Sequence, residues 1–404
     1  SGEFTEYGFL GDQPVIAPYV GALALHMSVN EALAGLKALQ AVPLMHLGEA
    51  GFASSARVHQ DRMKVSHRMT ADDKFFTISA LLNVVRKVPS PDGKRTVGYF
   101  QALFEADPSV QAGLELVKNQ TDRGTVKGLL GEKVLQQRGM DTARTSPDAQ
   151  TTNYLEGLLA AEWKYFETLS MPMTWGGRYR IPAGFADDAL MHEGDTFGIT
   201  GSIAGYLRAI IAASELGPGK AGISKTEAVK RIQQLINDVA KLKRDSRTGL
   251  FYHTYQKADH KPAENAEGIL EVPSLDNKWV EGALRMALQV FKEDLAPATV
   301  LQIDEILKGM DFKSFYDTQI GAYRIAKNGN TGNWLPGHYN AMTNEFRHHM
   351  ISEIGKHPEQ ARAWTNALNN TATGRSDVMI WDGFAPRTNK TDGRVLKILQ
   401  KLLT

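Results

Sequence analysis

Apolar residues recur at helical spacing through most of the chain, and several of these stretches have clear start or stop signals. Ser224-Lys-Thr-Glu227 has the capping-box form, in which two side chains bond the free amides at a helix start. The following residues form an apolar face of Val229, Ile232, Leu235, Ile236 and Val239. The apolar stretch 199–216 ends at Gly217-Pro218-Gly219, which stops a helix. The pattern therefore predicts a chain built mainly from helices.

Further helices are expected wherever this spacing repeats. Ser28-Val-Asn-Glu31 is a second capping box, and Asp72 and Asp73 after Thr70 indicate a helix start, where the helix dipole favours acids. The remaining expected helices span 76–88, 97–117, 279–291, 300–307, 339–354, 359–368 and 395–403. Strand-like alternation is rare and is clearest at 252–255 and 322–325. The expected fold class is all-α, an α/α toroid of about six helical pairs with short β-hairpins at its rim.

The region 89–192 departs from this helical pattern. Residues 136–152 are polar, and residues 171–188 contain Trp175-Gly-Gly177 and Pro182-Ala-Gly184, which indicate loops. The chain has no strict internal repeat, which argues against a regular solenoid. We expect a single toroid domain over residues 1–404, in which 89–192 is an insertion or an irregular part of the rim.

Composition removes several classes of protein. Lys and Arg total 46 against 45 Asp and Glu, so the charge balance gives no sign of a nucleic-acid-binding surface. The absence of cysteine excludes disulfides, thiol catalysis and zinc–thiolate sites. No apolar run reaches the ~20 residues of a membrane-spanning helix, so no membrane insertion is expected. Neither a phosphate-binding loop nor a Gly-x-Gly-x-x-Gly motif is present, and no cofactor is expected.

Glu345 is the first candidate for acid–base chemistry. A helix from about Tyr339 would place it among aromatic and methionine side chains, with His348 and His349 one turn away. Partial desolvation raises the pKa of a carboxyl group and suits it to act as a general acid. The alternative is an exposed glutamate that pairs with Arg347 or with a histidine.

Asp276 is the second carboxylate of interest because it follows Pro273-Ser-Leu at an expected helix start. Its commoner role would be an N-cap, which contributes about 1 kcal/mol. Its functional role would be a carboxylate held at the rim of a cleft, where Glu271 from the preceding loop joins it. His253, on an extended stretch, would bond either a sugar hydroxyl or a backbone carbonyl in the core.

Aromatic rings near these acids give flat faces for stacking on sugar rings. The candidate sugar platforms are Tyr252, Tyr255, Trp279, Trp334, Tyr339 and Trp381. The stretch His192-Glu-Gly-Asp195 suits first a helix cap with loop hydrogen bonds and second a sugar-binding rim, at which Asp195 and Asp382 are candidate contacts. The spacing of that histidine and the acids is not that of a zinc motif, so no metal site is expected.

Several segments follow one another in a recognisable order. They are Asp195-Thr-Phe-Gly-Ile-Thr-Gly-Ser-Ile-Ala-Gly-Tyr206, Gly249-Leu-Phe-Tyr-His253, Val272-Pro-Ser-Leu-Asp276, Met310-Asp-Phe312 with Phe315-Tyr-Asp317, and 339–345. Their order and gaps resemble the glucoamylase-like helical-barrel domain of bacterial β-1,2-glucan hydrolases and of the transglycosylating part of cyclic β-1,2-glucan synthases. Segments 7–12 and 15–25 also resemble this family, but in the family they follow the part that resembles 339–386. The segment order here therefore looks permuted.

The resemblance implies a ring of α-hairpins with an acidic cleft at one end. By position it places Glu345 on a proposed catalytic glutamate, Asp276 on a cleft aspartate and His253 on an aromatic or imidazole side chain. A family glutamate expected near Asp382 is absent. We therefore expect a glycoside hydrolase acting on a β-linked glucan or a related bacterial polysaccharide. Glu345 would protonate the leaving oxygen, while Asp276 would activate water or stabilise the transition state.

Two alternatives belong to other classes of protein. A non-catalytic glycan-binding or cell-envelope scaffold protein is favoured by the permuted order and the missing glutamate. A polysaccharide lyase or sugar epimerase is suggested by His348-His349 beside Arg347. In each case we expect a polysaccharide or oligosaccharide partner, no nucleic acid, and a periplasmic or secreted location, although the chain shows no secretory signal.

Overall fold

The computed structural model of the protein describes residues 15–16, 18–26, 29–43, 45–46, 51–53, 56–59, 62–65, 69–121, 147–169, 174–175, 179–180, 189–190, 196–340 and 346–373. Its α-helices are α1 (Pro18–Ala24), α2 (Val29–Gln40), α3 (Ala71–Val85), α4 (Tyr99–Ala106), α5 (Pro108–Thr121), α8 (Ala149–Leu169), α9 (Tyr206–Leu216), α10 (Lys225–Val239), α11 (Ser274–Phe291), α12 (Pro297–Gly309), α13 (Arg347–Lys356) and α14 (Arg362–Thr373). The expectation of a mainly α-helical fold is confirmed. None of the helices in these ranges is long and apolar enough to cross a lipid bilayer.

Within the described ranges, the helical elements also include three short 3-10 turns and one π-helical turn. The 3-10 turns are η3 (Pro218–Lys220), η4 (Lys313–Phe315) and η5 (Pro358–Gln360). The π-helical turn, η2 (Thr200–Gly205), runs directly into α9, and the amide of Tyr206 donates to the carbonyl of Gly201. This wider turn begins at Thr200, shortly after β10 ends at Gly198.

The strands are short and pair in antiparallel fashion. They are β1 (Val15–Ile16), β2 (Ala56–His59), β3 (Arg62–Val65), β4 (Met69–Thr70), β5 (Lys87–Pro89), β6 (Thr96–Gly98), β7 (Thr174–Trp175), β8 (Tyr179–Arg180), β9 (Ala189–Leu190), β10 (Thr196–Gly198), β11 (Thr254–Gln256), β12 (Glu271–Pro273), β13 (Tyr316–Asp317), β14 (Ala322–Arg324), β15 (Ala326–Asn328) and β16 (His338–Tyr339). Three pairings join segments more than 50 residues apart in the chain: β4 with β9, β10 with β11 and β12 with β15. Backbone hydrogen bonds on both sides of His253 bring the loops before α9 and α11 together.

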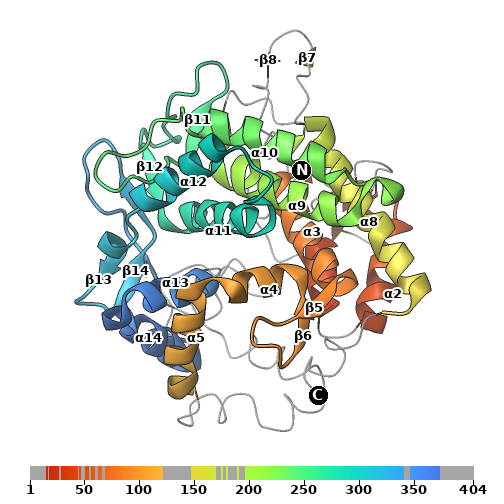
Figure 1. Ribbon diagram of the computed structural model, residues 1–404, viewed down its shortest axis with the longest axis horizontal. Coiled ribbons are helices and arrows are strands. Elements are labelled where there is room, and N and C mark those ends of the chain that lie inside the picture. Colours follow the sequence, from red (N-terminus) through yellow and green to blue (C-terminus); the bar gives the residue numbers. More distant parts are fainter. Residues whose placement is uncertain are drawn as a thin grey trace.

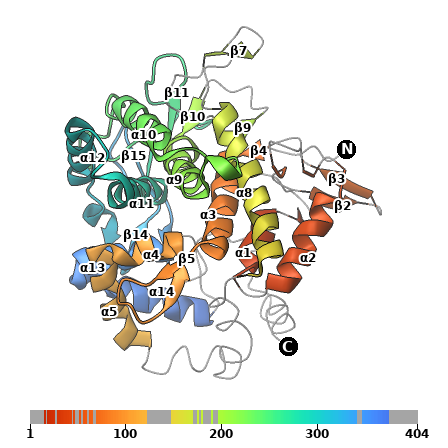
Figure 2. The same cartoon turned by 45° about the vertical axis from the view of Figure 1, so that its right-hand side comes forward.

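Helices α3, α9 and α11 are neighbours at the centre of the molecule, and a second set of helices packs outside them. Helix α8 contacts α3 and α9, α10 contacts α9, and α12 contacts both α10 and α11 (Figures 1 and 2). Apart from Arg208, helix α9 is apolar from Leu207 through Ala213, which is typical of a helix buried on all sides. Helices α8, α10 and α12 therefore cover the outer sides of α3, α9 and α11.

Local signals placed several helix ends correctly. The hydroxyl of Thr70 accepts from the amide of Asp73, and that of Ser224 accepts from the amide of Glu227, so both residues are N-caps as expected. Gly217 ends α9 with a φ of 75°, a left-handed conformation that glycine adopts without steric cost. These signals act within one turn of the chain, which is why they could be recognised without the fold.

The helix expected over 97–117 is divided in two at Pro108. Proline cannot donate the amide hydrogen bond that a continuous helix requires. The carboxylate of Asp107 instead accepts from the amide of Ser109 at 2.8 Å, which caps the new start. Helix α5 therefore leaves α4 at an angle and reaches α13 (Figure 1).

The helix expected over 339–354 is wrong at its start. Tyr339 lies in β16 and pairs with Tyr323 of β14, so its backbone is extended. Helix α13 begins at Arg347 instead. The stretch expected at 395–403 lies outside the described residues.

Helices α5 and α13 cross at two glycines. A Cβ atom on Gly113 would lie 1.9 Å from the carbonyl oxygen of Ile351, and one on Gly355 would lie 1.7 Å from that of Ser109. A side chain at either position would force the two backbones apart. The crossing fixes α13, and with it the side chains of His349 and Ser352 that line a cavity beside α11.

We expect Gly113→Ala to lower the free energy of unfolding by about 1–3 kcal/mol, because overpacking outweighs the gain in helix propensity. The matched control is Gly157→Ala in α8, where an added Cβ meets nothing within 4 Å. That control should raise the free energy of unfolding by about 0.5–1 kcal/mol. Urea unfolding of both variants provides the measurement. Equal stabilisation by Gly113→Ala and Gly157→Ala would contradict the close contact of α5 and α13 at Gly113.

Candidate functional site

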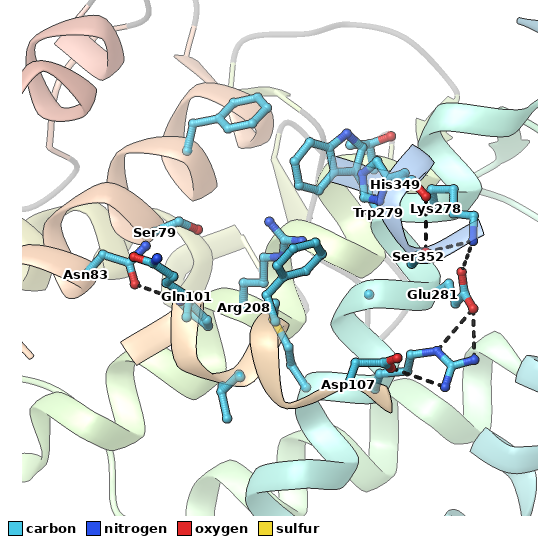
Figure 3. A pocket seen from close by; sticks show the side chains of 18 of the residues that line it. Ser79, Asn83, Gln101, Asp107, Arg208, Lys278, Trp279, Glu281, His349 and Ser352 are labelled. Atoms are coloured by element: carbon cyan, nitrogen blue, oxygen red, sulfur yellow. Dashed lines mark hydrogen bonds and ion pairs between the residues drawn. The ribbon is translucent and has the colours of Figure 1, made fainter. Parts of the chain in front are cut away.

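A cavity of about 620 Å³ lies between the central helices. Helix α11 runs along it, and α1, α3, α4, α5, α9 and α13 also contribute lining residues, part of which Figure 3 shows. Most of the lining is apolar, but acids and cations enter it from several helices. Such a concave, largely apolar space with a few polar groups is the usual form of a ligand-binding site.

Three extended segments meet at His253, whose Nε2 lies 3.9 Å from the cavity-lining Asp276. The amide of Ile199 donates to the carbonyl of His253 at 3.1 Å, and the amide of His253 donates to the carbonyl of Glu271 at 2.8 Å. The His253 backbone is therefore held on both sides. This brings the ends of β10 and β11 beside the start of β12, directly before α11.

The buried side chain of Asn277 locks these segments onto α11. Its Oδ1 accepts from the amide of Phe251 at 2.7 Å. Its Nδ2 donates to the carbonyl of Phe251 at 2.9 Å and to that of Pro273 at 2.7 Å. One amide thus satisfies both backbone groups of Phe251 and fixes the position of His253 relative to the first turn of α11.

Asp276 lies in that first turn and does not cap the helix. The N-cap position is Pro273, and the Asp276 Oδ1 accepts a short hydrogen bond from the hydroxyl of Thr200. This corrects the expectation that capping is its commoner role. The Asp276 side chain keeps 23% of its surface exposed and lines the cavity, so it is a carboxylate held at a rim.

His253 lies between two carboxylates. Its Nδ1 is 3.5 Å from Oε2 of Glu271, and its Nε2 is 3.9 Å from Oδ1 of Asp276. A side-chain hydrogen bond from His253 outweighs the opposing effect of burial and holds the pKa of Glu271 below its usual range. The structure thus brings together three residues that were expected at the site, in a carboxylate–imidazole–carboxylate arrangement.

Trp279 lies one turn beyond Asp276 and also lines the cavity. The Cζ atom of Arg208 lies 4.5 Å from the centre of its ring, and His349 meets the ring edge-on at 4.6 Å. Asp72 and Asp73 at the start of α3 contribute to another wall of the same cavity. Acidic, aromatic and cationic groups from four helices therefore share one space.

A buried ion network joins α11 to α13 at another wall. Lys278 Nζ contacts Glu281 at 2.5 Å and also pairs with Glu353, while Lys356 lies 2.5 Å from Glu281 and 2.9 Å from Glu353. Burial alone would raise the pKa of Glu281, but the positive charges of Lys278, Lys356 and Arg285 lower it. Both acids are therefore ionised in the folded protein at neutral pH.

Other candidate platforms lie away from the cavity. Tyr252 and Tyr255 are buried in the core, where the Tyr255 hydroxyl donates to the carbonyl of Lys243 at 2.7 Å. Tyr339 is buried and stacks on Phe346. These positions correct the expectation that the three tyrosines stack on sugars, because neighbouring side chains cover their rings. Trp279 alone among the described platform candidates lines the cavity.

Trp334 does not line the cavity and packs against the hydrophobic core. Its ring meets Phe315 edge-on at 5.0 Å, and Arg324 and Lys327 lie over it at 5.2 and 4.9 Å. Glu345, Asp195, Trp381 and Asp382 lie outside the described residues. His348 belongs to α13, but its side chain is not described.

Asn277, Thr200 and Arg208 were not singled out from the sequence. Asn277 sits beside Asp276 and looked like an ordinary first-turn residue, whereas its partner Phe251 is 26 residues away. Thr200 meets a carboxylate 76 residues away. Arg208 did carry a signal, because it is the one charged residue in the otherwise apolar stretch 199–214.

Among the described residues, no group of three or more histidine, aspartate or glutamate side chains could hold a metal ion. No protein-family model matches the chain, and no curated protein matches it in sequence. The geometry of the cavity is therefore the basis on which a function is assigned.

We expect Asn277→Ala to destabilise the protein, because it leaves the buried amide and carbonyl of Phe251 without partners, at about 1–3 kcal/mol for each group. Asn330→Ala is the matched control, since Asn330 is an exposed turn residue that bonds Glu264 at 3.1 Å. Its effect should stay within about 0.5 kcal/mol. Urea unfolding measures both variants. Similar free energies of unfolding for the two would contradict the role given to the Asn277 hydrogen bonds.

The ion network predicts how stability depends on pH. The folded-state pKa of Glu281 is lowered from the ordinary value of 4.5, and that of Glu353 is lowered as well. The two acids therefore contribute fully to the free energy of unfolding above their unfolded-state pKa. This contribution is lost as the pH falls through the lower folded-state pKa. We expect the free energy of unfolding to decline as the pH falls below about 4.5.

The variant Glu281→Gln should flatten this acid decline and cost about 3–5 kcal/mol at neutral pH, because Lys278 loses a buried partner. Glu227→Gln is the control, since the Glu227–Arg231 pair lies at the surface of α10. Its cost should stay below about 1 kcal/mol. Denaturation measured across pH separates the two variants, and an unchanged acid slope in Glu281→Gln would count against the network.

Proposed function

We propose that this protein is a glycoside hydrolase that binds a β-linked glucan or a related bacterial polysaccharide in the cavity along α11. The observation that carries the proposal is the Asp276 carboxylate, held by Thr200 at the cavity rim one turn from the Trp279 ring. Glycosidic cleavage needs a positioned carboxylate beside a surface on which a sugar ring can rest. Asp276 and Trp279 supply this pair from one rigid helix.

In the proposed reaction Asp276 takes a proton from the attacking water or stabilises the oxocarbenium-like transition state. Thr200 donates to one carboxylate oxygen, which orients the other toward the substrate. Glu271 lies 3.5 Å from the His253 imidazole, which in turn lies 3.9 Å from Asp276 and positions its carboxylate. Glu345 is the proposed general acid, on the resemblance of the segment 339–345 to the glucoamylase-like helical-barrel family.

We further infer that the helices close into an α/α toroid. The inner position of α3, α9 and α11 and the outer position of α8, α10 and α12 support this arrangement. A toroid would place the loops before α9 and α11, which carry Thr200 and Asp276, on one end of the ring. That end would then be the face through which a polysaccharide enters.

The test is release of reducing sugar from a panel of glucans, β-1,2-linked first, followed by quantitative kinetics. We expect Glu345→Gln and Asp276→Asn each to lower kcat by about 10²–10⁴-fold. Glu305→Gln and Asp294→Asn, on exposed parts of the chain away from the cavity, are the matched controls and should retain full activity.

Two results would redirect the proposal. Glucan binding in a thermal-shift assay without release of sugar from any glucan would favour the non-catalytic glycan-binding protein. Cleavage that survives both Glu345→Gln and Asp276→Asn would remove these residues from the reaction.

A further inference from the structure

Arg208 projects from α9 into the wall of the cavity as a buried cation. The residue is 7% exposed, and its Nε is buried without a hydrogen-bond acceptor. Within the part of the chain that the structure describes, its guanidinium makes no ion pair, and it lies over the rings of Trp279 at 4.5 Å and Phe75 at 5.5 Å. Burial lowers the pKa of Arg208 to about 9, which leaves the guanidinium charged at neutral pH.

Two other buried cations show how this protein neutralises such a charge. Lys74 lies 2.8 Å from Glu162, and Lys278 is held between Glu281 and Glu353. A buried charge without a counterion is costly, and contacts with aromatic rings compensate only part of that cost. Arg208 has no such carboxylate partner among the described residues, and its charge would be neutralised by an anion on a bound ligand.

The surroundings of Arg208 leave its guanidinium accessible from the cavity. Figure 3 shows it at the centre, with Ser79, Asn83 and Gln101 on one side and Trp279 and His349 on the other. Across from it, Gly282 of α11 has no side chain, and a Cβ there would lie 3.7 Å from Nη2. The hydroxyl of Ser79 is buried without a hydrogen-bond partner among the described residues.

We propose that Arg208 binds an oxyanion carried by the ligand of this cavity, either the carboxylate of a uronic acid residue or a phosphate ester on a sugar. The planar guanidinium can hold two oxygens of such a group at once, with the Trp279 face against the sugar ring. That the ligand is a glycan rests on the proposed function, whereas the oxyanion site follows from Arg208 itself.

The position of Arg208 also separates anion binding from the proposed chemistry. Gly282 lies six residues after Asp276 on α11, which is about 9 Å along the helix axis. An acidic group beside Asp276 would be repelled by that carboxylate. The charged sugar residue would therefore sit deeper in the cavity than the bond that is cleaved.

Calorimetric titration at constant ionic strength tests the proposal with four probes. They are a β-linked disaccharide of glucose and glucuronic acid, its neutral glucose–glucose counterpart, a glucose phosphate and inorganic phosphate. We expect the wild type to bind one of the acidic sugars about tenfold to a hundredfold more tightly than the neutral disaccharide. The acidic sugar that is preferred identifies the oxyanion as a carboxylate or a phosphate ester, and inorganic phosphate reports the contribution of the anion alone.

Arg208→Met should remove this preference and leave the affinity for the neutral disaccharide unchanged. Gly282→Val tests the same site with Arg208 in place, because its added methyl groups would occupy the space in front of Nη2. Valine is a better helix former than glycine, so this variant should fold. Arg95→Met, at an exposed arginine that pairs with Glu105 at 2.9 Å, is the matched control and should keep the preference.

Equal binding of acidic and neutral sugars by the wild type would overturn the proposal, as would a preference that persists in both Arg208→Met and Gly282→Val. The result is distinguishable from the test of hydrolysis. An Arg208-dependent preference without glucan cleavage would keep the oxyanion site and remove the hydrolase. Cleavage of neutral glucan without any preference for acidic sugars would do the reverse.

Discussion

The hydrogen bonds of the buried Asn277 amide determine the geometry of the candidate site. The strands around His253 have only three residues each, and pairings this short do not fix their register strongly. By bonding both backbone groups of Phe251 and the carbonyl of Pro273, the Asn277 side chain ties this loop to the rigid body of α11. The distances between His253, Glu271 and Asp276 therefore depend on a residue that itself lies in the core.

Helix α11 carries charged side chains toward both the cavity and the ion network. Its first turn presents Asp276 at the rim, and Trp279 follows on the cavity side. Lys278 and Glu281 form the buried network with α13, which itself is held against α5 by the glycine crossing. Helix α13 contributes His349 beside Trp279. The packing of α5 against α13 therefore also positions a residue of the cavity wall. Stability and the shape of the cavity are thus set by the same contacts.

The sequence was informative where structure depends on neighbours along the chain. The caps at Thr70 and Ser224 and the stop at Gly217 follow from local hydrogen bonds and backbone conformation, so they were predicted correctly. The segment from Tyr339 was misassigned because its pairing with Tyr323 is a contact between segments that are not adjacent. The role of Asp276 could not be read for the same reason. A first-turn aspartate looks like a cap until the fold brings Thr200 to it.

The π-helical turn before α9 has a consequence for which side chains face inward together. Thr200 and Arg208 are eight residues apart, and in a regular α-helix they would point about 80° away from each other. A wider turn accommodates roughly one additional residue, which reduces that angle to about 20–30°. Both side chains consequently reach the same cavity. A regular helix over the same residues would rotate one of the two away, so the wider turn is as much a part of the site as its side chains.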